Sequence, residues 1–425
     1  MGTTLIKQDL HMLSGESGEA DRFAMSVITR MAKAVGASRL ISIEQAHLDA
    51  CALMSDSSLE FIQHIVENGG RVRVPTTLNM VSLDLDAWRT LGVPEDFGNK
   101  ATRIAEAYKR LGAVPTWTCA PYQVFSSPRF GQQIAWGESN AVAYANSVLG
   151  ARTNRYGDYM DVCAAITGRV PYYGLHCEAE RAATYLVKVE GVNPGAWSHT
   201  ASWATLGHLL GQEIGSGIPA VEGLPRAVVS DQLKALLAAA ASSGGIALCH
   251  LVGITPEAPS AKAALHGKRP ERTIRVGPEE LRASWEDLSS ASEGDRVDAV
   301  ILGCPHSSYH EFETMIQFVD AMGGASVSSH VQLLVISNAP MVALARRNGW
   351  IEKLQAFGAI LVHDTCPFHS PIVARDARTI ATDSGKCAYD APGELGVQVA
   401  FGTTRECLLA AVRGQVVREE IQWSM

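Results

Sequence analysis

Three cysteines, Cys119, Cys304 and Cys366, occupy equivalent places in the predicted structure, each just past the end of an apolar run typical of a strand. The runs are residues 114–118, 297–302 and 359–362. Ligand sites in open α/β sheets gather beyond the carboxyl ends of the strands. Three thiolates meeting there could hold an iron–sulfur cluster, and a three-cysteine set would leave one iron an open position. Such an iron could act as a Lewis acid on a substrate hydroxyl, as a dehydration requires.

The alternative is that these are three unrelated loop thiols. The chain has nine cysteines, widely spaced and without a C-x-x-C pair, so local spacing carries no metal signature. An odd number in a chain of this size makes a disulfide framework improbable. A cysteine chosen at random here is best interpreted as a small buried hydrophobe.

The elements that would position these cysteines alternate between strand and helix in the second half of the chain. Strands are expected at 246–254, 297–302, 331–336, 359–362 and 397–401. Helices are expected at 278–289, 308–322, 339–348 and 404–412. Continuous apolar strands alternating with helices predict an α/β fold with parallel sheets covered by helices.

The first half is less regular. A helix is expected at 99–111, and the glycine-rich and aromatic stretch 191–223 fits no simple pattern. We expect one catalytic core over 1–425, with an N-terminal helical segment at 1–69 and two α/β lobes at roughly 70–230 and 231–425. No linker rich in proline, serine or glycine separates them.

Composition narrows the class of protein. The 425 residues are 47% hydrophobic and 19% charged, enough for a large core. The net charge of −8, without a basic stripe, argues against a nucleic-acid partner. We find no apolar signal segment and no run long enough to span a bilayer, and therefore expect a cytoplasmic protein without a membrane partner.

Longer motifs resemble the aconitase X family, a branch of the aconitase superfamily. The most specific is the segment 134–174, with I-A-W-G-E-S-N-A-V-A-Y-A-N-S-V-L-G-A-R-T-N-R-Y-G-D at its start and A-A-I-T-G-R-V-P-Y-Y-G at its end. Others are M-L-S-G-E-S-G at 12–18, T-T-L-N at 76–79, C-P-H-S-S at 304–308, D-T-C-P at 364–367 and D-S-G-K at 383–386. The resemblance covers essentially the whole chain.

The resemblance implies an aconitase-like, multi-lobed core with Cys119, Cys304 and Cys366 as the metal ligands. The cofactor would be a [2Fe–2S] or [4Fe–4S] cluster or mononuclear iron. The family also uses a small swivelling domain, fused or separate, whose serine is thought to act in proton transfer. Because we find no further region after the catalytic part, we expect that domain on a separate small subunit.

Catalytic candidates are His306, Ser384, Lys386 and Glu16. His306, two residues after Cys304, could donate to a leaving hydroxyl or could pair with loop backbone. Ser384 and Lys386 could shuttle a proton and hold a carboxylate, or could form an ordinary polar turn. Glu16 is either a catalytic or substrate-binding acid or a carboxylate favoured at a helix start.

Substrate-binding candidates lie in the matched motifs, where arginine suits a planar carboxylate and the other side chains are polar. They are Asn79, Ser139, Asn140, Asn154 and Arg155. Any of them could instead satisfy buried backbone groups.

The expected function is a hydro-lyase that dehydrates a small hydroxy acid, with iron acting on the leaving hydroxyl. The known family substrates are cis-3-hydroxy-L-proline, which gives a pyrroline carboxylate, and mevalonate 5-phosphate. We favour the hydroxyproline. A phosphate substrate would need an additional basic cluster, since it brings about two negative charges. A different class also stays open: an iron–sulfur binding or sensing protein without turnover.

Overall fold

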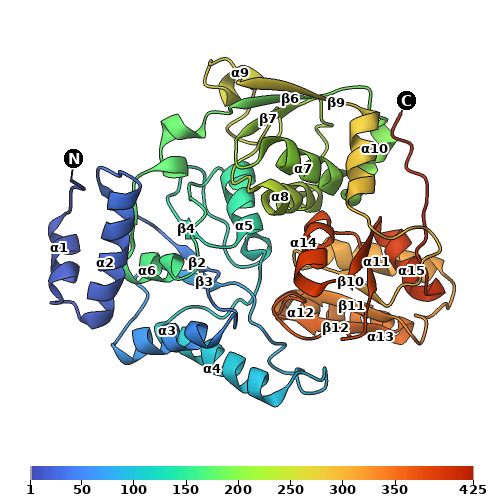
Figure 1. Ribbon diagram of the computed structural model, residues 1–425, viewed down its shortest axis with the longest axis horizontal. Helices are drawn as coiled ribbons and strands as arrows, with labels where there is room; N and C mark the ends of the chain where they lie inside the picture. The colour runs from blue at the N-terminus through green and yellow to red at the C-terminus, as the bar shows by residue number, and fades with distance from the viewer. Residues whose placement is uncertain (1, 425) are drawn as a thin grey trace. The chain divides into compact units, whose positions relative to one another are not determined.

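The computed structural model describes residues 2–424, which form two compact units, Met1–Ala182 (unit 1) and Ala183–Met425 (unit 2). Figure 1 labels their elements, and each unit is described by itself. The boundary follows Ala182, whereas the sequence pattern predicts a lobe boundary after residue 230. The reason is close packing between α7 (Thr200–Ile214) and α8 (Ser230–Gly244), on either side of that position. A Cβ added to Gly207 would lie 2.0 Å from the carbonyl oxygen of Leu236, so glycine permits this close approach.

Unit 1 combines short strands with helices around its own core. Its helices are α1 (Lys7–Ser14), α2 (Glu19–Ala34), α3 (Asp56–Glu67), α4 (Glu95–Leu111), α5 (Ser139–Tyr144) and α6 (Met160–Thr167). Its strands are β1 (Leu40–Ser42), β2 (Ala46–Leu48), β3 (Thr76–Leu78), β4 (Ala135–Trp136) and β5 (Arg169–Pro171). Single helical turns are η1 (Pro121–Gln123), η2 (Ala145–Leu149), η3 (Gly174–His176) and η4 (Glu178–Arg181). Strands β3, β2 and β4 form a parallel sheet in that order, and β1 pairs with β5 antiparallel.

The predicted strand at 114–118 is wrong, although the segment does run beside β3. Val114 forms an isolated bridge with Thr77, and the Thr118 N–H donates to the carbonyl oxygen of Leu78 over 3.2 Å. Between them, Trp117 has a φ of 42°, a left-handed backbone that interrupts an extended strand. Cys119 therefore follows a strand-like segment rather than a strand.

Unit 2 contains two parallel sheets. Its strands are β6 (Tyr185–Val189), β7 (Pro219–Glu222), β8 (His250–Leu251), β9 (Arg272–Val276), β10 (Ala299–Leu302), β11 (Gln332–Ser337), β12 (Ala359–His363), β13 (Thr379–Thr382) and β14 (Gln398–Phe401). One sheet has the order β8-β7-β6-β9 and the other β12-β11-β10-β13-β14. All strand pairs in both are parallel, which confirms the predicted α/β fold with parallel sheets.

Helices cover these sheets. Besides α7 and α8 they are α9 (Ala261–Ala264), α10 (Pro278–Asp287), α11 (Tyr309–Ala321), α12 (Ala339–Arg347), α13 (Trp350–Phe357), α14 (Gly385–Leu395) and α15 (Thr404–Arg413), with the turn η5 (Pro194–Ser198). The core of the five-stranded sheet is buried between strands such as β10 and β11 and helices α11, α12 and α15. Four predicted helices, α10, α11, α12 and α15, match within a few residues. The stretch 191–223 contains α7 and β7, which periodicity did not reveal.

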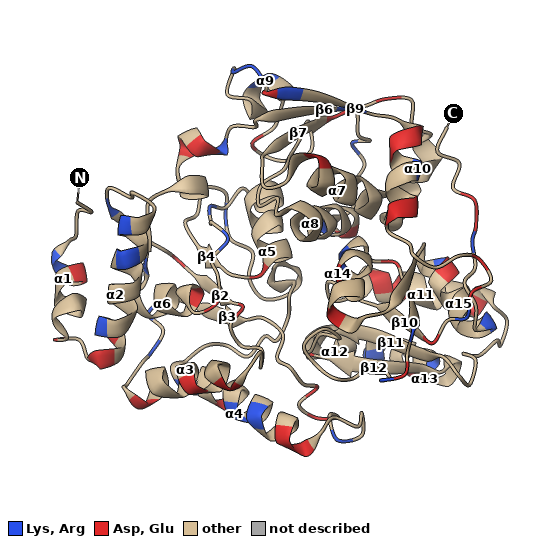
Figure 2. Ribbon diagram, viewed as in Figure 1, with Lys and Arg blue, Asp and Glu red and all other residues tan. Residues whose placement is uncertain are grey.

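Charged side chains lie on helices and on loops alike. Figure 2 shows both signs mixed along α2 and α4. Helices α7 and α8 together carry three charged side chains, Glu213, Asp231 and Lys234. Among residues 2–424, none of the helices has the length and apolar character needed to cross a membrane.

Candidate functional site

Cys304 and Cys366 lie at the same edge of the five-stranded sheet of unit 2. Cys304 follows β10 and Cys366 follows β12, and these parallel strands flank β11. Both thiols are partly exposed and neither is in a disulfide. The chain turns sharply before Cys304, where Gly303 has a φ of 97°. A Cβ there would lie 2.0 Å from the carbonyl oxygen of Ile336, so glycine is required for this cysteine to leave the strand end.

Hydrogen bonds connect the two cysteine loops. The Nε2–H of His306 donates to the carbonyl oxygen of Thr365 over 2.9 Å, next to Cys366. The hydroxyl of Ser337, at the end of β11, donates to the carbonyl oxygen of Ser307 over 2.6 Å. His306 is buried, with 2% of its surface exposed. Its Nε2 thus binds loop backbone.

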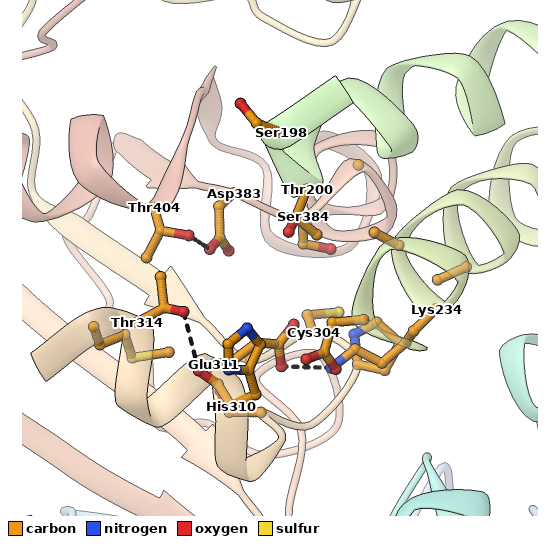
Figure 3. A pocket seen from close by; sticks show the side chains of 18 residues that line it. Ser198, Thr200, Lys234, Cys304, His310, Glu311, Thr314, Asp383, Ser384 and Thr404 are labelled. Carbon is orange, nitrogen blue, oxygen red and sulfur yellow. Dashed lines mark hydrogen bonds and ion pairs between the residues drawn. The ribbon is translucent and has the colours of Figure 1, made fainter. Parts of the chain in front are cut away.

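A cavity of about 150 Å³ opens beside Cys304, entirely within unit 2. Figure 3 shows Cys304, Lys234 and Glu311 on one side of it and Asp383, Ser384 and Thr404 on the other. Sites for drug-sized ligands measure about 300–1,000 Å³. The cavity therefore suits a small metabolite.

A buried charge cluster forms one wall of the cavity. The Lys234 Nζ lies 2.5 Å from Glu311 Oε2 and 3.6 Å from Asp231 Oδ1. It also donates to the carbonyl oxygen of His306 over 3.2 Å. The hydroxyl of Ser308 donates to Asp231 Oδ2 over 2.8 Å, and the Ser308 N–H donates to Glu311 Oε2 over 2.8 Å. The Lys234 ammonium therefore pairs with two carboxyl groups beside the loop that carries Cys304.

The cavity is rich in carboxyl groups. Asp231, Glu311 and Asp383 line it together with one lysine, Lys234. Burial raises the pKa of Glu311 to about 7, in spite of the opposing effect of the Lys234 ammonium. Burial also raises the pKa of Asp383, whose Oδ2 accepts a 2.6 Å hydrogen bond from the Thr404 hydroxyl. The wall can thus carry a proton near neutral pH and attract a cationic group.

Ser384 is both a cavity residue and a helix cap. Its Oγ accepts a 3.0 Å hydrogen bond from the Cys387 N–H at the start of α14. The Cys387 thiol contacts that of Cys304, and this contact and burial raise the pKa of Cys387 well above its usual value. Lys386 is half-buried in the first turn of α14 and is not among the residues lining the cavity.

Four cavity residues are not among those predicted from the sequence: Asp231, Lys234, Glu311 and Asp383. A local signal exists for two of them. Asp231 and Lys234 are the charged residues of the otherwise alanine- and leucine-rich α8, and both are more than nine-tenths buried. Lysine and aspartate are rarely buried unless paired, so a charged pair in an apolar helix marks a site.

In unit 1, Cys119 lies beside several of the predicted residues. The Asn140 Nδ2 donates to the carbonyl oxygen of Cys119 over 2.9 Å and to Glu138 Oε1 over 2.6 Å. The Ser139 N–H donates to Glu138 Oε2 over 2.6 Å, so Glu138 caps α5. Tyr122 donates to Asn140 Oδ1 over 2.9 Å. Asn140 and Ser139 therefore belong to one hydrogen-bonded group around this cysteine.

A carboxyl group missed in the sequence joins the same region. Asn79 Nδ2 donates to Asp49 Oδ1, and Asn79 itself is almost fully buried. Burial, reinforced by Glu138, raises the pKa of Asp49 well above its usual value. The Asn79 Oδ1 has no hydrogen-bond partner in the described structure.

Three predicted residues lie apart from these groups. Asn154 binds backbone, donating to the carbonyl oxygen of Tyr173 over 3.1 Å and accepting from the Leu175 N–H over 2.8 Å. Glu16 is exposed and pairs with His11 over 2.8 Å. Arg155 is exposed on the rim of a different, largely apolar hollow of unit 1, formed around α2 and α6.

The cysteines meet part of the ligand requirement of an iron–sulfur cluster. Soft thiolates are the ligands that such clusters take, and Cys304 and Cys366 offer two from one sheet edge. Cys119 is partly exposed but belongs to unit 1. Within either unit, over residues 2–424, no three cysteine, histidine or carboxylate side chains gather closely enough to hold a metal ion. The three predicted ligands are therefore divided between the units, with Cys119 in unit 1 and Cys304 and Cys366 in unit 2.

Family models match nearly the whole chain. The model described as aconitase X first domain matches residues 2–179, the second domain 183–286 and the third domain 297–413. The limits of the first two matches follow the boundary between unit 1 and unit 2.

Curated relatives fall into two groups. The chain is 45% identical to a cis-3-hydroxy-L-proline dehydratase of Pseudomonas aeruginosa, over 97% of this chain and 71% of that protein. It is 40% identical to an enzyme of the same name from Hypocrea jecorina, over 96% of this chain and 69% of that protein. A phosphomevalonate dehydratase large subunit of Methanocaldococcus jannaschii is 35% identical, over 95% of this chain and 99% of that protein.

The fold also matches a solved structure. The holo-form of Thermococcus kodakaraensis aconitase X superposes with a TM-score of 0.85 and 32% identity, covering 96% of this chain and 100% of that chain.

Proposed function

The chain belongs to the aconitase X family, and from that premise we propose that it is a hydro-lyase that dehydrates cis-3-hydroxy-L-proline to a pyrroline-2-carboxylate. The two relatives above 35% identity carry that name. The observation that carries the choice of substrate is the carboxyl-rich cavity beside Cys304.

The charges of the cavity favour an amino acid. Asp231, Glu311 and Asp383 face a single lysine, Lys234. A hydroxyproline brings a secondary ammonium, which carboxylates attract. Mevalonate 5-phosphate has no cationic group and brings a phosphate of about two negative charges, while the Lys234 ammonium already contacts two carboxyl groups. The additional basic cluster expected for the phosphate substrate is not among the described residues that line this cavity.

The cofactor in this proposal is an iron–sulfur cluster or iron held by Cys119, Cys304 and Cys366. When bound, the iron supplies a Lewis acid for the leaving hydroxyl. Gly303 and His306 set the positions of Cys304 and Cys366, and the Asn140 side chain holds the backbone of Cys119. Ser384 borders the cavity, where its hydroxyl can contact substrate. The other binding or catalytic roles remain predictions, and they concern Lys386, Asn79, Ser139, Arg155, Asn154 and Glu16.

A small swivelling subunit completes the proposed enzyme. The archaeal relatives are named large subunits, which implies a small subunit in those enzymes. The runner-up function is that of a phosphomevalonate dehydratase large subunit, the name that the archaeal relatives carry. A non-catalytic iron–sulfur protein is the third candidate.

The test is to purify the chain anaerobically with its small partner, measure iron and sulfide, and assay both substrates. We expect iron, and dehydration of the hydroxyproline alone. Turnover of mevalonate 5-phosphate would favour the runner-up, and iron without turnover of either substrate would favour the third candidate. Cys304→Ser should abolish both iron content and turnover, whereas Cys177→Ser, a partly exposed cysteine elsewhere in unit 1, should preserve both.

A further inference from the structure

Glu311 is the cavity carboxyl whose geometry is best suited to proton donation. It lies in the first turn of α11, where the capping Ser308 and its own N–H fix the helix start. Both contacts of its carboxyl, with the Lys234 Nζ and the Ser308 N–H, use Oε2. Its side chain is 26% exposed, against 2% for Lys234 and 5% for Asp231. Of this cluster, Glu311 is the member that a ligand in the cavity can reach.

His306 is poorly placed for the same task. Its Nε2–H donates to the carbonyl oxygen of Thr365, and the ring does not line the cavity. Glu311, by contrast, faces the cavity together with Cys304 and Ser384.

We infer that Glu311 is the general acid of the proposed dehydration, giving its proton to the hydroxyl that leaves C3 of the substrate. This inference depends on the proposed function. In the step, the C3–O bond breaks with its electron pair on oxygen, Glu311 protonates that oxygen, and water departs. The C2–H bond breaks as a base takes the proton, and its electrons form the C2=C3 double bond. The enamine then tautomerises to the pyrroline, and solvent reprotonates Glu311.

Protonation of Glu311 near neutral pH supports this role. Burial raises its pKa to about 7, and Lys234, which opposes that rise, keeps the carboxyl able to give the proton up. Asp231 faces the same pair from α8, and Asp383 faces the cavity from the end of β13. A general acid must be protonated, so dehydration should decline as pH rises through about 7.

The test compares two leaving groups in the complete complex with the small partner. Chloride leaves without a proton, so elimination from cis-3-chloro-L-proline needs no general acid. Glu311→Gln should slow dehydration of cis-3-hydroxy-L-proline by about 100-fold or more while chloride elimination stays close to the wild-type rate. The decline above pH 7 should appear in the wild type for the hydroxyl substrate and be absent for the chloride.

Asp320→Asn is the matched control, since Asp320 lies on the same helix and pairs with Lys353, and neither residue lines the cavity. It should leave both reactions unchanged. Equal loss of both reactions in Glu311→Gln, or full dehydration by that variant, would overturn the role of Glu311 while leaving the proposed function intact. A wild-type complex that dehydrates no hydroxyproline would overturn the proposed function, and this inference with it.

Discussion

The imidazole of His306 joins the two cysteine loops of unit 2, because its Nε2–H donates to the carbonyl oxygen of Thr365 over 2.9 Å. That carbonyl belongs to the residue before Cys366, and His306 follows Cys304 by two residues. The hydrogen bond lies in a buried setting, where a carbonyl deprived of its donor costs about 1–3 kcal/mol. We therefore expect this ring to help fix the spacing between the two cysteine loops.

The first prediction concerns that hydrogen bond. His306→Ala should destabilise unit 2 by about 1–3 kcal/mol and lower the iron content of the anaerobically purified complex. His306→Gln offers an amide N–H at a similar reach and should retain more of both. Urea unfolding and a colorimetric iron assay measure the two effects. Equal iron content in the wild type and the alanine variant would show that the ring does not position the cysteines.

A second prediction concerns the turn between β10 and Cys304. Gly303→Ala combines a positive φ with a Cβ that would lie 2.0 Å from the carbonyl oxygen of Ile336. Gly324→Ala is the matched control, because Gly324 has a φ of 88° and open space around its Cβ position. The control should cost about 1–2 kcal/mol from backbone strain alone.

The Gly303 variant should lose more stability than its control and should also bind less iron, since the carbonyl of Ile336 belongs to the neighbouring strand β11. Thermal unfolding and iron analysis of both variants provide the comparison. If the two variants behave alike, the close approach to β11 has no role in positioning Cys304.

The third prediction concerns pH and the stability of unit 1. Burial raises the pKa of Asp161 to about 7, although the backbone N–H groups of Asp49 and Val162 donate to it. The folded state then binds a proton more tightly than the unfolded state. The contribution of Asp161 to the free energy of unfolding is therefore complete below pH 3.8, the ordinary pKa of the group. This contribution is lost as pH rises through about 7.

Asp161→Asn removes this titration and should flatten the fall in unfolding free energy between about pH 5 and 7, where one group contributes at most about 1.4 kcal/mol per pH unit. The variant should be less stable overall, because one backbone N–H would face an amide NH₂. Denaturant unfolding at several pH values measures the slope. An unchanged slope would mean that Asp161 is not the carboxyl that titrates in this range.

Sequence pattern predicts the framework of unit 2 well and the contents of its cavity poorly. Strands such as β10 and helices such as α11 have local signals: continuous apolar runs, a capping serine and apolar residues at helical spacing. Cys304 and Cys366 could be placed because each directly follows such a strand.

The charged residues of the cavity have no comparable signal in the local sequence. Asp231 comes from α8, Glu311 from α11 and Asp383 from the loop after β13, so their meeting depends on how the helices pack on the sheet. The strand expected before Cys119 was wrong because the left-handed backbone of Trp117 arises from tertiary context that an apolar run does not encode.

The last prediction separates the two roles open to Ser384. Its Oγ accepts a hydrogen bond from the Cys387 N–H, so loss of the hydroxyl removes a helix cap worth about 1 kcal/mol. Ser384→Ala should therefore lower stability by about that amount. If the hydroxyl also transfers a proton or binds substrate, turnover should fall by about 100-fold or more, beyond anything that a lost cap explains.

Thr403→Ala is the matched control, because Thr403 caps α15 in the same way, accepting from the Glu406 N–H over 3.2 Å, and does not line the cavity beside Cys304. The two variants should lose similar stability, measured by thermal unfolding, while turnover of cis-3-hydroxy-L-proline by the complex falls in Ser384→Ala alone. If turnover is similar in both variants, Ser384 acts only as a helix cap. Loss of a hydroxyl that contacts substrate would instead lower turnover in Ser384→Ala alone.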